Sequence, residues 1–444
     1  MMESSAIIKT VQLLLALSLL VIIHELGHFM FAKLFKCRVE KFYLFFDYKY
    51  SLFKKKIGET EFGIGWIPIG GYVKISGMVD ESMDTEQLKQ EPQPWEYRAK
   101  PAWQRFFIII GGVMMNILLA MVIFIGITYA WGDNYIKNSD VHNGYAFSEV
   151  AKEMGFKNGD KIISIDGEEI ESYSLIPQMI LLGDNRIVNI NRNGEEIKLT
   201  ITDAMIQTML KDKGFINLRI PFNIAGIQEG SIAESAGLIK GDSLVAVNGV
   251  NMVYLDEFSA AFVANRNQTV QLGVIRKGVD TVMTVATTLD STAMLGVMPG
   301  ANIGELYTIS YKDYTLAEAI PAGIVRGYDE IGKYLQQLKV IVNPDTGAYK
   351  EVGGFIAMGS IFPGEWSWFA FWHITALLSI MLAVINILPI PALDGGHLVF
   401  IVYEMIARRP PSQKVLEVAQ YIGFFIIMGV VILANGNDII KFFS

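Results

Sequence analysis

The residues best suited to chemistry in this sequence are His24, Glu25 and His28, within the stretch HELGH. Two histidines four residues apart share one face of a helix, so both can reach a single metal ion. Glu25 lies about 100° further round such a helix, close enough to take a proton from a metal-bound water. The spacing predicts a hydrolytic metal site, but an isolated HExxH also arises by chance.

The apolar sequence before this stretch strengthens the interpretation. Residues 11–23 carry no charge and run directly into HELGH, which places the motif at membrane depth. Ionisable side chains there are costly and usually functional, and a hydrogen-bonded structural cluster is the alternative. A cleaved signal peptide is disfavoured, because Lys9 is the only basic residue before the apolar core and HELGHF follows that core.

The composition is that of a membrane protein with sizeable polar parts. Of the 444 residues, 52% are hydrophobic, which is too many for an ordinary soluble protein. The formal net charge of −8 gives no reason to expect a nucleic-acid partner. Cys37 is the only cysteine, so any metal must be held by histidine and carboxylate.

Four apolar stretches predict four transmembrane helices. Basic residues cluster after the first, before the second, and between the third and fourth, and such clusters mark the cytoplasmic side. The long segment 132–365 is therefore expected outside the cytoplasm. The predicted order is a first transmembrane helix (1–35), a cytoplasmic-face β-hairpin region (36–105), a second transmembrane helix (106–131), two polar domains (134–205 and 215–300), a connector (301–365), a third transmembrane segment (366–397), and a loop with the fourth helix (398–444).

The polar sequence contains an internal repeat. VAKEMGFKNGDKIISIDGEEI begins at Val150 and IAESAGLIKGDSLVAVNGVNM begins at Ile232. Each copy predicts a short helix, a Gly-Asp turn, an apolar strand and an Asp-Gly or Asn-Gly hairpin turn. The pattern resembles two tandem PDZ-like α/β domains, which bind extended peptides or chain ends at a sheet edge. Spacer domains without a peptide ligand are the alternative.

A catalytic zinc site usually has three protein ligands and keeps the fourth position for water. The stretch NILPIPALDGGH, residues 386–397, lies at the cytoplasmic end of the third span, where the first span also places HELGH. Its two prolines break the helix, and irregular backbone at membrane depth is tolerated only inside protein or beside a wet cavity. Asp394 is the predicted third ligand, and His397 is the competing candidate.

Residues 61–78, EFGIGWIPIGGYVKISGM, alternate apolar residues around a Pro-Ile-Gly-Gly turn. This pattern predicts a β-hairpin at the cytoplasmic membrane face, with an edge that could pair with an unwound substrate. A hairpin that only packs the membrane boundary is the alternative. Residues 80–96 are rich in acidic residues and contain glutamine and proline, a composition that predicts a solvated loop.

Three motifs together resemble the site-2 protease family of intramembrane metalloproteases: HELGH in a first span, GIGWIPIGGYV after it, and NILPIPALDGG in a later span. Two PDZ-like domains between the second and third spans are most similar to the bacterial regulator of sigma-E protease branch. The resemblance covers essentially the whole chain. It implies one zinc ion with His24, His28 and Asp394 as ligands, and Glu25 as the general base.

The resemblance also implies roles in substrate binding. Asn386 would hold or orient the substrate backbone, where a helix–helix hydrogen bond is the alternative. The resemblance also supports Ile64 and Gly65, at the hairpin edge, as the residues that pair with the unwound substrate. Family members often carry a second asparagine at the position of Met381. This departure from the family pattern leaves open which residues hold the substrate.

The activity implied by the resemblance is regulated intramembrane proteolysis in a bacterial cytoplasmic (inner) membrane. The active site would face the cytoplasm, with the PDZ-like domains in the periplasm. The implied substrates are single-span membrane proteins, either anti-sigma-factor-like proteins after a first cleavage or remnant signal peptides. A PDZ-based membrane scaffold is a rival that has no need of Glu25. A membrane-anchored zincin is another, but it carries HExxH outside the bilayer.

Overall fold

The computed structural model describes residues 2–78, 91–212, 214–279 and 281–443, so most of the predicted loop at 80–96 lies outside the described residues. The chain divides into two compact units. The first contains Met1–Gly132, Asp313–Val342 and Tyr349–Ser444, and the second contains Asp133–Lys312 and Asn343–Ala348. All four predicted transmembrane helices lie in the first unit.

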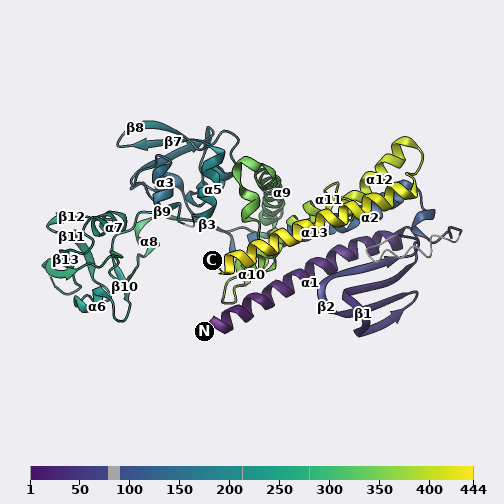
Figure 1. Ribbon diagram of the computed structural model, residues 1–444, viewed down its shortest axis with the longest axis horizontal. Coiled ribbons are helices and arrows are strands. Elements are labelled where there is room, and N and C mark those ends of the chain that lie inside the picture. The colour runs from purple at the N-terminus through teal and green to yellow at the C-terminus, as the bar shows by residue number, and fades with distance from the viewer. Residues whose placement is uncertain (1, 79–90, 213, 280, 444) are drawn as a thin grey trace. The chain divides into compact units, whose positions relative to one another are not determined.

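Among the described residues, four helices of the first unit are long and apolar enough to cross a membrane, which agrees with the four predicted spans. They are α1 (Met2–Leu34), α2 (Ala102–Trp131), α11 (Trp368–Ile387) and α13 (Gln413–Phe443) (Figure 1). The unit also contains the helices α9 (Leu316–Val342) and α10 (Phe355–Ile361), within the predicted connector. The helix α9 packs on α2 through Gly323, where a Cβ would lie 2.5 Å from the backbone nitrogen of Ile125.

Helices α1 and α2 touch through their backbones. A Cβ added at Gly27 would lie 2.2 Å from the carbonyl oxygen of Gly111, and a Cβ at Gly111 would lie 2.7 Å from that of Gly27. Only glycine permits such an approach, and small residues at helix crossings are typical of membrane proteins. The contact lies between His24 and His28 in the sequence of α1, so it brings the HELGH turn directly against α2.

The third transmembrane segment is broken, as its prolines predict. Helix α11 ends at Ile387, and a further helix, α12 (Asp394–Ala407), begins after the proline-containing turn. The expectation of a loop from residue 398 onward was wrong, because α12 continues to Ala407. Its first turn packs closely on the preceding turn, and a Cβ at Gly395 would lie 2.1 Å from the carbonyl oxygen of Leu388.

The predicted hairpin region is a folded sheet built from two long, bent strands, β1 (Val39–Ile57) and β2 (Thr60–Ile75). The register pairs residues 41–44 of β1 with residues 71–74 and also with residues 61–64 of β2. Residues 61–65 pair in addition with the later part of β1. The inner segments of the sheet are therefore 41–44 and 61–64, and residues 71–75 form an outer edge.

This register corrects the prediction that Ile64 and Gly65 form a sheet edge. Ile64 pairs with Leu44 on one side and with Phe53 on the other. A Cβ at Gly65 would lie 2.2 Å from the carbonyl oxygen of Phe46. Alternation along residues 61–78 correctly indicated extended chain, but the predicted hairpin around the Pro-Ile-Gly-Gly turn was wrong. Residues 61–64 and 71–74 each pair with residues 41–44 and not with one another, and such a pairing order depends on a segment outside the stretch itself.

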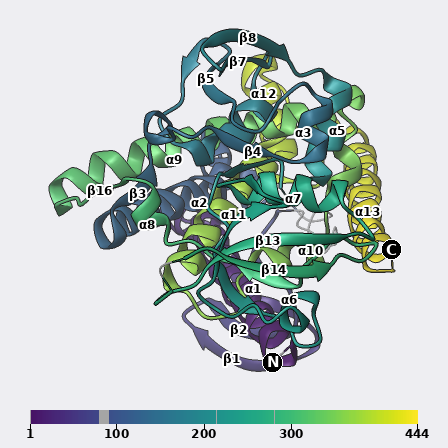
Figure 2. The same cartoon turned by 90° about the vertical axis from the view of Figure 1, so that its left-hand side faces the viewer.

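The second unit contains two similar halves, each with a four-stranded sheet. Figure 2 shows β5, β7 and β8 of the first sheet and β13 and β14 of the second. The first half has sheet order β6-β5-β7-β8 and the second has β12-β11-β13-β14. The elements are β3 (Asp133–Ile136), β4 (Tyr145–Phe147), α3 (Glu149–Glu153), β5 (Lys161–Ile165), β6 (Glu168–Glu169), α4 (Ile176–Leu182), β7 (Ile187–Arg192), β8 (Glu195–Thr200), α5 (Asp203–Lys211), β9 (Ile216–Leu218), β10 (Ile224–Ile227), α6 (Ile232–Ser235), β11 (Ser243–Val247), β12 (Val250–Asn251), α7 (Leu255–Ala264), β13 (Thr269–Ile275), β14 (Met283–Thr288), β15 (Val297–Pro299), α8 (Ile303–Leu306) and β16 (Ile309–Lys312).

The boundary between the halves differs from the predicted one. Strand β9 pairs with β4, so the first half extends to Leu218. The sequence analysis instead places the start of the second domain at residue 215. In the second half, β15 pairs with β10 in the same manner. Each half thus closes with a strand from its far end, a long-range pairing that local sequence patterns do not reveal. Their PDZ-like identity stays a prediction.

A buried ion pair recurs in both halves. The Asp160 carboxylate accepts hydrogen bonds from Arg192 at 2.8 Å and 2.7 Å, and the same guanidinium donates to the carbonyl of Gly155. In the second half, Asp242 accepts two hydrogen bonds of 2.7 Å from Arg276. Through these arginines, the aspartate of each Gly-Asp turn connects the short helix to the sheet.

The second ion pair predicts a pH-dependent stability. Hydrogen bonding from Arg276 holds the pKa of Asp242 below its ordinary value. Its stabilisation is therefore present above the unfolded pKa of about 3.9 and is lost as the pH falls through the lower folded pKa. We expect Arg276→Met to lower the Tm of the second unit at pH 7, whereas the exposed Arg266→Met does not. Limited proteolysis of the full chain at increasing temperature measures this, and equal Tm values would contradict it.

Candidate active site

The three predicted metal ligands come together in the first unit. The Oδ2 atom of Asp394 lies 3.2 Å from Nε2 of His24 and 3.4 Å from Nε2 of His28. The two imidazole nitrogens are 3.2 Å apart. Both imidazoles are buried, so α1 and the first turn of α12 present three ligand atoms to one enclosed point.

The chemistry of this cluster fits a metal ion. Asp394 Oδ2 is buried and accepts no hydrogen bond of normal geometry from the described residues, although two imidazole nitrogens face it. Three lone pairs that converge without a proton or a cation between them repel one another. Two imidazoles and one carboxylate are a known set of catalytic zinc ligands. His397 is not among the three residues whose ligand atoms lie within 4.8 Å of one another.

The orientation of His28 is set by α2. Its Nδ1 lies 2.9 Å from the carbonyl oxygen of Ile108, which can only accept a hydrogen bond. His28 Nδ1 therefore carries the proton, and the lone pair of Nε2 points to Asp394. Such a backbone partner behind a histidine ligand fixes both its tautomer and its ring plane.

Asn116 of α2 is a site residue that the sequence analysis missed. Its side-chain amide lies 3.2 Å from His24 Nδ1, and its Oδ1 has no partner among the described residues. The oxygen and nitrogen of an amide are assigned from the hydrogen-bond network. With Oδ1 facing His24, Nδ1–H donates to it and Nε2 is free for a metal. The signal that could have identified this residue is an asparagine within a charge-free span, and the structure shows that it is fully buried.

Gly112 of α2 makes room for both imidazoles. A Cβ at this position would lie 2.6 Å from His28 Nε2, 2.7 Å from His24 Cε1 and 2.9 Å from His24 Nδ1. The contacted atoms belong to rings that Ile108 and Asn116 already hold in place, so neither ring can easily move away. The absence of a side chain at Gly112 is therefore part of the site.

A cavity of about 750 Å³ opens beside the cluster and is lined by Glu25 and Asn386 as well as the three ligands. The backbone amide of Val73, on the outer edge of the sheet, lies against the Glu25 carboxylate. Asn386 Nδ2 lies 3.5 Å from His24 Nε2. Residues 70–75 line the cavity, but Ile64 and Gly65 do not.

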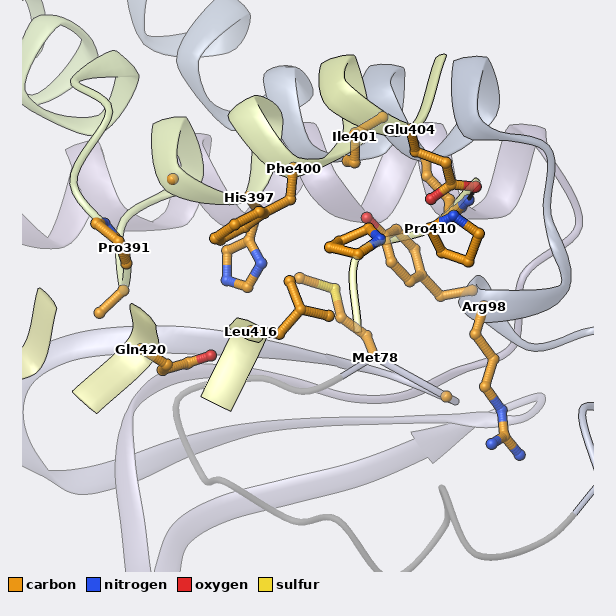
Figure 3. Close-up of a pocket in the computed structure, with 16 residues that line it drawn as sticks. Met78, Arg98, Pro391, His397, Phe400, Ile401, Glu404, Pro410, Leu416 and Gln420 are labelled. Carbon is orange, nitrogen blue, oxygen red and sulfur yellow. Dashed lines mark hydrogen bonds and ion pairs between the residues drawn. The ribbon is translucent and has the colours of Figure 1, made fainter. Parts of the chain in front are cut away.

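A second cavity, of about 380 Å³, adjoins the first (Figure 3). Met78, Ala392, His397 and Gln420 line both. Figure 3 shows the His397 ring projecting from α12 into this space, close to Met78 and Leu416. His397 therefore lies between the two cavities, although the sequence made it a rival metal ligand.

The fold and the cluster of His24, His28 and Asp394 are typical of multi-pass membrane proteins with a buried metal centre of the hydrolase type. The model of peptidase family M50 matches residues 12–430. The chain belongs to peptidase family M50, which confirms the resemblance to site-2 proteases drawn from the three motifs.

Bacterial relatives match nearly the full length of the chain. Metalloprotease MmpA of Caulobacter vibrioides is 26% identical, over 98% of this chain and 96% of its own. The Regulator of sigma E protease of Haemophilus influenzae is 26% identical, over 96% of this chain and 98% of its own. Further relatives carry names that contain the words zinc metalloprotease. The protein is therefore a zinc-dependent metalloprotease, and its apolar helices and bacterial relatives indicate an inner-membrane protein.

The space at Gly112 can be tested with a matched pair of variants. We expect Gly112→Ala to lose zinc, with binding weakened at least about 10–100-fold as for other disturbed ligand orientations, because its methyl group enters the space of both imidazoles. Gly126→Ala is the control, since a Cβ at Gly126 of the same helix meets nothing within 4 Å. Zinc per purified chain is the measurement. Equal zinc content in both variants would show that the close contact is unimportant.

Proposed function

We propose that this protein is an intramembrane zinc endopeptidase that cleaves single-span membrane proteins, with the zinc ion held by His24, His28 and Asp394. The observation that carries the proposal is the buried Asp394 Oδ2, which has no hydrogen-bond donor among the described residues and lies near two imidazole nitrogens. Zinc, when bound, supplies a Lewis acid that activates water and polarises the scissile carbonyl.

Glu25 is the general base in this proposal. It follows His24 directly on α1 and lines the same cavity. Its carboxylate takes a proton from the attacking water as the new C–O bond forms. It then delivers that proton to the amide nitrogen as the C–N bond breaks, so that the products are a carboxylic acid and an amine. Close placement by the helix makes the carboxylate effective without any large movement.

The substrate is held as an extended strand, because a helical peptide bond is shielded by its own hydrogen bonds. Residues 71–75 replace Ile64 and Gly65 as the proposed edge, since they line the cavity and no second strand pairs with them within the described chain. Strand addition at such an edge uses backbone hydrogen bonds and tolerates varied sequences. Asn386, which lines the same cavity, orients the substrate backbone through its amide.

The relatives and the membrane-length helices support the proposed substrate class. Anti-sigma-factor-like proteins after a first cleavage, and remnant signal peptides, are single-span proteins of the kind that this site would take. The clusters of basic residues support an active site that opens to the cytoplasm and a second unit in the periplasm. That unit is proposed to consist of two PDZ-like domains that bind peptide or screen substrates by size.

Replacement of Glu25 separates catalysis from metal binding. We expect Glu25→Gln to retain zinc and to cleave a single-span substrate at least about 100-fold more slowly, because the amide cannot accept the water proton. Glu59→Gln, an exposed position in the turn between β1 and β2, is the control. The measurement combines cleavage in proteoliposomes with zinc content. Full cleavage by Glu25→Gln would exclude this residue as the base.

A further inference from the structure

We propose that the 380 Å³ cavity beside the metal cluster is a specificity pocket, which receives one large apolar side chain of the substrate next to the scissile bond. The inference rests on the proposed proteolytic function and adds a preference for substrate sequence. It concerns the cavity drawn in Figure 3, whose walls come from α12, α13, the turn between them, and the chain around Met78 and Arg98.

The lining of the cavity is suited to an apolar group. Apolar side chains contribute much of the lining, among them Met78, Phe400, Ile401, Pro410, Pro411 and Leu416. Binding sites in proteins commonly occupy about 300–1,000 Å³. A volume at the lower end of that range suits a single bulky side chain better than a folded segment.

The charged residues in the lining already have partners. Arg105 donates to the Glu404 carboxylate, and Arg98 donates to Glu96 at 2.6 Å. An incoming charged side chain would therefore find no free counter-charge on these groups and would lose its own hydration. An apolar side chain has no such hydration to lose, and its entry releases water from the wall. The pocket consequently selects apolar over charged residues.

The position of the pocket relative to the edge strand indicates how a side chain would reach it. Met78, Ala392, His397 and Gln420 line both cavities, so the pocket joins the active-site cavity. Met78 follows the edge segment 71–75 by only three residues. A substrate strand that pairs along that edge advances about 3.3 Å per residue, and alternate side chains project to opposite faces. One side chain near the scissile bond therefore projects past Met78.

The test uses a single-span substrate in proteoliposomes, with each position around the cleavage site changed to Ala, Leu, Phe or Asp. At one position, the wild-type protein is expected to cleave the Leu or Phe substrate at least about 10-fold more efficiently than the Ala substrate, and the Asp substrate least. Leu416→Trp, which fills the pocket, should remove the preference, so that the ratio of the rates for the Phe and Ala substrates falls to about one. Phe400→Ala, which enlarges the pocket, should raise the relative rate for Phe.

The matched control is Val415→Trp, which adds the same bulk at an adjacent, exposed position of α13 outside the cavity lining. It should leave the preference unchanged. A wild-type protein that cleaves all substrates equally would overturn the pocket but leave proteolysis established. Equal loss of rate on every substrate in Leu416→Trp and Val415→Trp would also overturn it, since the substitution would then act on stability alone.

Discussion

The contact between one carboxylate oxygen and two imidazole nitrogens is the constraint on which the membrane unit depends. Asp394 comes from the first turn of α12, and the two histidines come from α1. These segments meet at one point because α1 touches α2 through Gly27 and Gly111, while the turn after α11 places the start of α12 beside them. The same helix α2 then supplies the Ile108 carbonyl and the Asn116 amide that orient the rings. The metal ligands and their support thus come from separate helices, and the packing of glycines holds them in register.

Much of this arrangement could be predicted from the sequence. His24 and His28 share a helical face at any HExxH, and the apolar run before them gave their depth in the membrane. The prolines of NILPIPALDGG indicated a broken helix, which the end of α11 at Ile387 confirms. Asp394 was matched to the histidines because both spans end on the side marked by basic residues. Each of these expectations uses local chemistry or a simple count of residues along a span.

Other features could not be predicted because they depend on pairing and packing between distant segments. The order of strands in the sheet makes residues 71–75 an edge and places Ile64 inside the sheet, paired with Leu44 and Phe53. Helix α12 begins with Asp-Gly-Gly, which read alone suggests a loop, and it forms because the glycines fit against the preceding turn. Strand β9 pairs with β4 of the first half, although the two strands are far apart in the sequence. Asn116 appeared to be one polar residue in an apolar helix until its neighbour His24 was known.

The choice between Asp394 and His397 as the third ligand is the central claim about this site, and zinc content tests it most directly. The measurement is zinc per chain after dialysis of wild-type protein, Asp394→Ala and His397→Ala, all purified in the same detergent. We expect about one zinc per chain in the wild type and in His397→Ala, and almost none in Asp394→Ala, since a three-ligand site needs its carboxylate. Retention of zinc by Asp394→Ala together with its loss from His397→Ala would contradict the account.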